Sequence, residues 1–315
     1  MATTALATTP ETYSYGPHDL QKVHVYNVQQ KEPGLSTKSS NQGYWVIYIH
    51  GGGWRDPRVL AESFGPTETF LQSQHASLIR EHTIAFASID YRLSAHPNFL
   101  QDRNTTDAAT QLRNAKHPDH LHDVQAAITF LQGRYDFGDR YILVGHSCGA
   151  TLAFQIVMGK VAGAAPTTTL PKPRAVVGVC GIYDLRLLRD DFSKEPIYQQ
   201  FIEGAFGPDE DLWDRVSPAK VSDPDDEGLE AGWPNGKLAL LAHSAGDELV
   251  NLSQFLAMKD VLERWKAAAA AKDNRTRQVV LLQDLQEPHD DVWGNGKELA
   301  TVIATAVREL VKIDS

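Results

Sequence analysis

Residues 141–150, YILVGHSCGA, give the strongest indication of the fold, together with the segments on either side of them. Tyr141 to Val144 has the β-branched and aromatic character of a buried strand, and Cys148 to Lys160 has the spacing of a helix. Between them stands a G-x-S-x-G motif, Gly145 to Gly149. At a sharp turn from strand to helix, the glycines permit strained backbone and the serine hydroxyl is held out at the helix N-terminus. The motif alone could be a glycine-rich loop, but this context predicts a nucleophile at Ser147.

Strands and helices alternate along most of the chain. Two apolar runs precede the motif, and three more follow it, with helical periodicity in the segments between them. Because strands separated by helices pair in parallel, the pattern predicts an α/β fold, a mostly parallel central sheet with helices on both faces. The expected strands are Tyr44–Ile49, Thr83–Ile89, Ala175–Cys180, Lys237–Ala242 and Gln278–Leu285, and the expected helices are Leu121–Leu131, Leu252–Lys272 and one around Leu299 to Leu310.

The chain divides into a leading segment and one large domain. Residues 1–42 are rich in Thr, Ser, Pro, Gly and Gln, which predicts a loosely ordered segment with one short strand at Val23–Val28. Residues 43–315 form the α/β domain. Within it, residues 182–233 show little periodicity and interrupt the alternation, so we expect a cap-like insertion over the C-terminal edge of the sheet.

Composition excludes several classes of protein. The chain of 315 residues has 42% hydrophobic and 22% charged residues, as globular proteins do, and its 30 basic and 40 acidic side chains give a net charge of −10. This charge disfavours nucleic acid as a partner. No stretch approaches the roughly 20 apolar residues of a membrane span, and Met1 to Lys22 lacks the features of a signal peptide. Two cysteines are too few for a disulfide framework. We expect a cytoplasmic protein that acts on a small molecule, with a homodimer left open.

A second motif lies upstream at His50-Gly51-Gly52-Gly53-Trp54, again after a strand. Glycines let backbone N–H groups approach a substrate oxygen, and the residue after a nucleophile supplies a further N–H group. Gly52, Gly53 and Cys148 are therefore the expected oxyanion hole. The alternative is a phosphate-binding loop or a tight turn, but the chain has no nucleotide-binding glycine motif after a strand.

A serine hydroxyl becomes a good nucleophile only when a base takes its proton, and the base needs a carboxylate to orient it. In this fold the acid and then the histidine follow the serine, each after a strand. Asp247 and His289 occupy such positions. Glu248 could replace Asp247, and His243 could be the base or a strand-end residue.

Two aspartates, Asp290 and Asp291, adjoin His289. Sequence neighbours orient an imidazole less well than a carboxylate that arrives from another strand, so Asp247 remains the preferred acid.

One cluster has the character of a metal site. His117, His120 and His122 stand near the expected start of a helix, but His120 and His122 are two positions apart and do not share a helical face. We interpret the cluster as a solvated helix cap and expect no metal and no other cofactor. Cys148 and Cys180 are interpreted as small buried apolar groups rather than nucleophiles.

Together these motifs resemble the α/β-hydrolase superfamily, in the branch shared by hormone-sensitive-lipase-like esterases and kynurenine formamidases. The resemblance extends from Tyr44 to the C-terminus. It includes the segment Ile89 to Ser94 (IDYRLS) and the turn Ser217-Pro218. The string HGGGWRDP from His50, together with the segments Gly145–Ala150 and His289–Trp293, looks most like fungal kynurenine formamidases. Gly53 stands where that family has alanine and esterases more often have glycine, which leaves the substrate less determined than the type of reaction.

The resemblance implies hydrolysis of N-formyl-L-kynurenine to L-kynurenine and formate in tryptophan catabolism. Ser147 would attack the formyl carbon with His289 as base, and Trp54 with residues of the insertion would flank the aromatic ring. The residues also allow a carboxylesterase of small acyl esters, or a catalytically inactive hydrolase fold that serves as a binding module.

Overall fold

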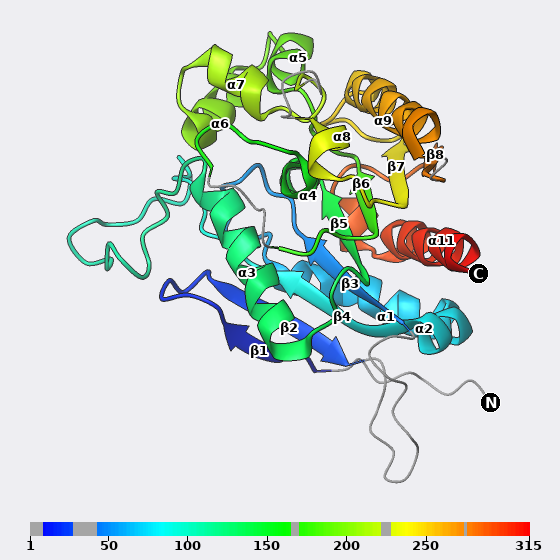
Figure 1. Cartoon of the computed structure of the whole chain (residues 1–315). Helices are drawn as coiled ribbons and strands as arrows, with labels where there is room; N and C mark the ends of the chain where they lie inside the picture. Colours follow the sequence, from blue (N-terminus) through cyan, green and yellow to red (C-terminus); the bar gives the residue numbers. More distant parts are fainter. Residues whose placement is uncertain (1–8, 28–42, 165–169, 222–227, 274–275) are drawn as a thin grey trace.

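The computed structural model describes residues 9–27, 43–164, 170–221, 228–273 and 276–315 (Figure 1). Its centre is one eight-stranded sheet in the order β1-β2-β4-β3-β5-β6-β7-β8. All pairs from β4 to β8 are parallel, and the pairs β1–β2 and β2–β4 are antiparallel. This confirms the mostly parallel sheet. The strands are β1 Glu11–Ser14, β2 Lys22–Asn27, β3 Tyr44–Ile49, β4 Thr83–Ile89, β5 Tyr141–His146, β6 Ala175–Val179, β7 Leu238–Ser244 and β8 Gln278–Leu285.

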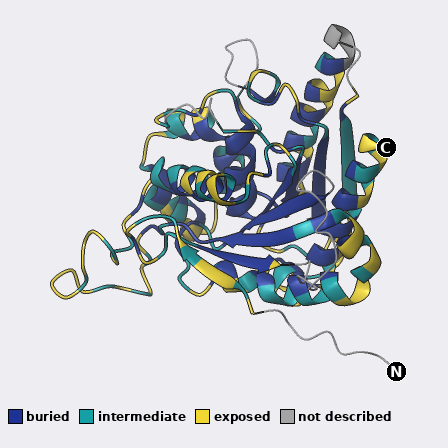
Figure 2. Cartoon of the chain, turned by 60° about the horizontal axis from the view of Figure 1, so that its bottom comes forward, coloured by how far each residue is buried: buried dark blue, intermediate teal, exposed yellow. Residues whose placement is uncertain are grey.

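Helices cover both faces of the sheet. Every residue of β3, β5, β6 and β7 is buried, which explains why these strands are continuous apolar runs without polar alternation. Figure 2 shows these central strands in dark blue, with the exposed residues on helices and loops around them. One core lies under α1, α2 and α11, and the other under α3, α4 and α9. These helices are α1 Gly65–Gln74, α2 Ala76–His82, α3 Asp119–Tyr135, α4 Cys148–Val157, α9 Leu252–Asp273 and α11 Lys297–Asp314.

The N-terminal segment contributes to the sheet. The strand expected at Val23–Val28 is β2, which pairs with β4 so that Val23 lies opposite Ile89. No pattern in the sequence indicates β1, because its residues ETYS are short, polar and mostly exposed. The described part of the segment is therefore more ordered than expected, and residues 1–8 and 28–42 lie outside the described residues.

The predicted insertion forms helices. Between β6 and β7 the chain makes α5 Leu185–Asp191, α6 Pro196–Phe206, α7 Glu210–Val216 and α8 Leu229–Gly232. In Figure 1, α5, α6 and α7 form a group beyond one end of the sheet strands. The Ser217 hydroxyl accepts a hydrogen bond from the Leu185 N–H group (3.0 Å) and donates one to the Trp213 carbonyl (2.7 Å), which ties the last turn of α7 to the start of α5.

The division at residue 42 and the cap-like character of the insertion stay predictions. Among the described helices, none combines the length and apolarity that crossing a bilayer requires.

Candidate active site

The serine of the G-x-S-x-G motif stands between the end of β5 and the first residue of α4. Its backbone has φ 53° and ψ −124°, a left-handed conformation that residues other than glycine rarely adopt. The turn is held because the Ser147 N–H group donates to the Val179 carbonyl (3.0 Å), and the Ser147 carbonyl accepts from the Ala150 N–H group (3.0 Å). Within the described residues the Ser147 hydroxyl makes no hydrogen bond, as an attacking group before substrate binds can do.

The glycines of the motif allow a close approach of three backbone segments. A Cβ atom on Gly145 would lie 2.2 Å from the Gly149 carbonyl oxygen, and one on Gly149 would lie 2.2 Å from the Ile49 carbonyl oxygen. Helix α4 therefore rests directly on the end of β3. A Cβ atom on Gly51 would lie 3.1 Å from the Ser147 Cβ atom, so the glycine loop after β3 touches Ser147.

Three consecutive residues of the glycine loop have positive φ values, and their role as an oxyanion hole stays a prediction. Gly52, Gly53 and Trp54 have φ values of 89°, 56° and 60°, which turn the chain sharply over the start of α4. The Trp54 N–H group donates to Cys148 Sγ (3.3 Å), and Tyr91 Oη lies 3.6 Å from the same sulfur. Burial raises the pKa of Cys148 to about 11, so its thiol stays protonated and anchors the loop rather than acting as a nucleophile.

Tyr91, in the IDYRLS segment, packs against the glycine loop. The Tyr91 ring stacks on His50 at 4.4 Å, and its hydroxyl lies 3.1 Å from the His50 carbonyl and 3.2 Å from that of Gly51. His50 Nε2 is 3.7 Å from Asp90 Oδ1, which accepts a hydrogen bond from the Ala61 N–H group (2.6 Å). Burial lowers the pKa of His50 to about 4 and raises that of Asp90 to about 7. Between these pH values the contact joins two neutral groups and is no ion pair.

The carboxylate next to the His289 ring is that of Asp247. His289 Nδ1 lies 2.8 Å from Asp247 Oδ2, while Asp247 Oδ1 accepts hydrogen bonds from the N–H groups of Leu249 (3.0 Å) and Val250 (2.8 Å). Burial acts to raise the pKa of Asp247, but these bonds and the His289 ring outweigh it, so the pKa is lowered overall. Glu248, the second candidate for the acid, instead accepts from the backbone N–H group of His289 (3.1 Å).

His243, Asp290 and Asp291 take no part in this pair. Within the described residues, His243 makes no hydrogen bond to Asp247, and burial lowers its pKa. Asp290 accepts a hydrogen bond from Trp293 Nε1 (3.2 Å), and Asp291 begins α10 (Asp291–Gly294). Neither aspartate orients the imidazole of its neighbour.

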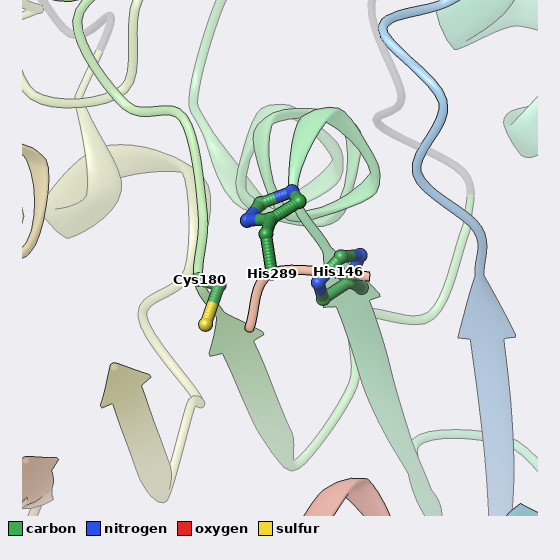
Figure 3. A group of neighbouring side chains, drawn as sticks. All are labelled: His146, Cys180 and His289. Atoms are coloured by element: carbon green, nitrogen blue, oxygen red, sulfur yellow. The ribbon is translucent and has the colours of Figure 1, made fainter. Parts of the chain in front are cut away.

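The His289 ring lies beside the turn that contains Ser147. Its centroid is 4.6 Å from that of His146, the residue directly before Ser147. Burial and the His289 ring lower the pKa of His146 far below 6.5, so His146 stays neutral and packs as an aromatic ring. The side chains of His146, Cys180 and His289, labelled in Figure 3, each offer a metal-ligating atom within 4.8 Å of the others. The absence of a metal stays a prediction.

The predicted substrate contact at Trp54 stays a prediction. Its indole is fully buried, with its ring centroid 5.0 Å from Phe206 and 6.1 Å from Phe201. The partly exposed ring of this group is Phe201, on α6, and it would lie 3.8 Å from a Cβ atom on Gly53. Sequence reasoning misses Phe201 because nothing in a weakly periodic insertion shows which residue reaches the glycine loop.

The interpretation of the histidine cluster as a solvated cap is wrong for His120, while His117 and His122 are partly exposed. His120 is 1% exposed, and its Nε2 lies 3.1 Å from the Ser94 hydroxyl. Burial lowers its pKa to about 3. His117 Nε2 instead lies 2.7 Å from the Ala162 carbonyl. These two histidines have separate partners, and His117 also packs against the insertion, where its backbone N–H group donates to the Ala205 carbonyl (2.7 Å) and its ring stacks on Phe206.

The sheet order and the strained serine turn define an α/β-hydrolase. A family model, BD-FAE, matches residues 35–262. A kynurenine formamidase-like hydrolase of Fusarium equiseti is 40% identical over 273 residues, which cover 86% of this chain and 85% of that protein. A kynurenine formamidase of Aspergillus versicolor is 39% identical, over 82% of this chain and 86% of that protein. The chain belongs to the BD-FAE family and to the kynurenine formamidase-like hydrolases, and it is a hydrolytic enzyme.

Solved structures agree on the fold. Esterase B of Lactobacillus rhamnosis, in an inhibited form, superposes with a TM-score of 0.61 at 16% identity, covering 98% of this chain and 89% of that one. Carboxyl esterase 2 of Tuber melanosporum gives a TM-score of 0.59 at 16% identity, covering 97% and 87%. At this identity the likeness concerns the fold alone, and the α/β-hydrolase prediction is confirmed.

Proposed function

We propose that the chain is a serine hydrolase that cleaves the formamide of N-formyl-L-kynurenine to L-kynurenine and formate. The observation that carries the mechanism is the 2.8 Å contact between His289 and Asp247 beside the turn of Ser147. The names of the curated relatives support the substrate. A cytoplasmic location and the oligomeric state stay predictions.

The first half of the reaction forms a formyl-serine. His289 Nε2 takes the proton of the Ser147 hydroxyl as the oxygen attacks the formyl carbon, and Asp247 stabilises the imidazolium that results. The oxyanion is held by the N–H groups of Gly52, Gly53 and Cys148. When the tetrahedral intermediate collapses, the C–N bond breaks and His289 gives its proton to the departing aromatic amine.

The second half releases formate. His289 takes a proton from a water molecule, whose oxygen attacks the formyl carbon of the ester. Collapse of the second intermediate breaks the bond to the Ser147 oxygen, which regains a proton from His289. The same three side chains thus complete both half-reactions without an added cofactor in the proposed scheme.

Replacement of the nucleophile tests the proposal. Ser147→Ala should lower kcat on N-formyl-L-kynurenine by at least about 10⁴-fold, because the acyl-enzyme cannot form. Purified protein of both forms is followed by the absorbance of the released aromatic amine, with circular dichroism as a control for folding. Full turnover by the folded variant would refute the serine mechanism. Cleavage of a p-nitrophenyl ester with a higher kcat/KM than the formamide would instead favour a carboxylesterase.

A further inference from the structure

One buried arginine beside the oxyanion loop has no carboxylate partner among the described residues. Arg55 follows the Gly52–Trp54 turn and is only 7% exposed. Its one hydrogen bond to a side chain is a long one, from Nη1 to Gln200 Oε1 (3.3 Å). No Arg55 nitrogen is fully buried without a partner, so the N–H groups that remain unpaired can be reached by a ligand. A desolvated cation with spare donors is costly unless an anion joins it.

The adjacent carboxylate is already engaged elsewhere. Asp56 accepts hydrogen bonds from Arg58, with Nε to Oδ1 at 3.0 Å and Nη2 to Oδ2 at 2.7 Å, in the forked geometry typical of an arginine–carboxylate pair. Asp56 also accepts from the backbone N–H group of Arg58 (2.9 Å). Burial lowers the pKa of Arg55, and the nearby charge of Asp56 offsets this only in part.

Three arginines, Arg55 among them, act on His96 through their charges. Burial lowers the pKa of His96, and the positive charges of Arg55, Arg58 and Arg113 lower it further, against the opposite effect of Asp56. The whole chain has a net charge of −10, so this local excess of positive charge is opposite in sign to the charge of the molecule. Such a region attracts an anionic group of a ligand and repels a cationic one.

An aromatic ring completes the arrangement. The Arg55 guanidinium carbon lies 5.7 Å from the centroid of Phe201, which also packs over Gly53. A substrate whose acyl oxygen lies at the oxyanion loop therefore has a phenyl ring and a guanidinium as its next neighbours. An aromatic amine that carries an anionic group on a short chain fits both.

We propose that Arg55 binds the carboxylate of the substrate, and that the enzyme thereby selects N-formyl aromatic amines bearing an amino-acid side chain over neutral formanilides. The inference rests on the proposed function and assigns its specificity to one residue. The guanidinium supplies two parallel donors to a carboxylate, a geometry that lysine does not reproduce.

The test compares two substrates that differ only in the carboxylate: N-formyl-L-kynurenine and its decarboxylated analogue, N-formylkynuramine. The variants are Arg55→Gln and Arg55→Lys. The matched control is Arg134→Gln, which removes an exposed arginine near the C-terminal end of α3, where its side chain lies over Tyr13. Thermal unfolding of each protein reports whether it is folded.

We expect the wild type to favour the carboxylate substrate, and Arg55→Gln to lower its kcat/KM about 10- to 100-fold, mainly through KM, with the analogue changed less than about threefold. Arg55→Lys should recover part of the discrimination, and Arg134→Gln should keep all of it. An equal loss on both substrates in folded Arg55→Gln, or equal use of both by the wild type, would overturn the role of Arg55. Failure of the wild type to cleave either formamide would instead refute the proposed function.

Discussion

The buried carboxyl of Asp90 should make the stability of the protein depend on pH in a way that one substitution removes. Burial raises its pKa from 3.8 to about 7. The folded state therefore holds a proton in the window between these values that the unfolded state has released, so stability falls as pH rises through that window and the loss is complete above about pH 7. A shift of about 3 pKa units corresponds to about 4 kcal/mol, at 1.36 kcal/mol per unit.

Asp90→Asn keeps an oxygen that can accept from the Ala61 N–H group but cannot ionise. Relative to the wild type, the variant should gain up to about 4 kcal/mol in free energy of unfolding between about pH 4 and pH 8.5. Urea unfolding at a series of pH values measures this difference, and Asp136→Asn, which removes an exposed aspartate at the end of α3, is the control. If the difference between Asp90→Asn and the wild type does not change with pH, the carboxyl is ionised in the folded protein and the reasoning is wrong.

Two further predictions concern the triad and the turn. Asp247→Asn should lower kcat by about 10⁴-fold while Glu248→Gln lowers it far less, since only Asp247 orients the ring; comparable losses in steady-state assays would contradict this assignment. Gly149→Ala should prevent stable folding, because its Cβ atom would lie 2.2 Å from the Ile49 carbonyl oxygen. Gly133→Ala is the control, because Gly133 lies within α3 with no atom near its Cβ position, and its free energy of unfolding should rise by about 0.5–1 kcal/mol. Equal melting temperatures for the two variants in thermal unfolding would refute the packing argument.

The central architecture could be predicted from sequence because its signals are local. Buried parallel strands require uninterrupted apolar runs, and β3, β4 and β8 have the expected bounds. The G-x-S-x-G motif is likewise a local signal, because Gly145 and Gly149 both lie where a side chain would clash with the backbone. Edge strand β1 has no such run, because only one side of it pairs and its residues face solvent.

The chemistry of the site is less local, which is why the sequence leaves choices open. Asp247 and Glu248 are adjacent and equally acidic, and only the folded loop shows that one bonds the ring of His289 and the other its backbone. The sequence places Trp54 at the substrate because it adjoins the oxyanion glycines. The folded chain adds what the sequence does not show, namely that the backbone of Trp54 is left-handed and that its indole packs against Phe206 of α6.

The insertion contacts both the glycine loop and the loop that carries Asp247, and this bears on how substrate specificity could evolve. Helix α6 places Phe201 against Gly53 of the glycine loop, and the same helix carries Tyr198, whose hydroxyl donates to the Leu249 carbonyl (2.8 Å). The N–H group of Leu249 in turn donates to Asp247. A shift of α6 would therefore move the ring above the oxyanion loop and strain the loop that holds the acid. Because the nucleophile turn rests on β3, β5 and β6 instead, changes in the insertion can alter substrate choice while the serine keeps its position.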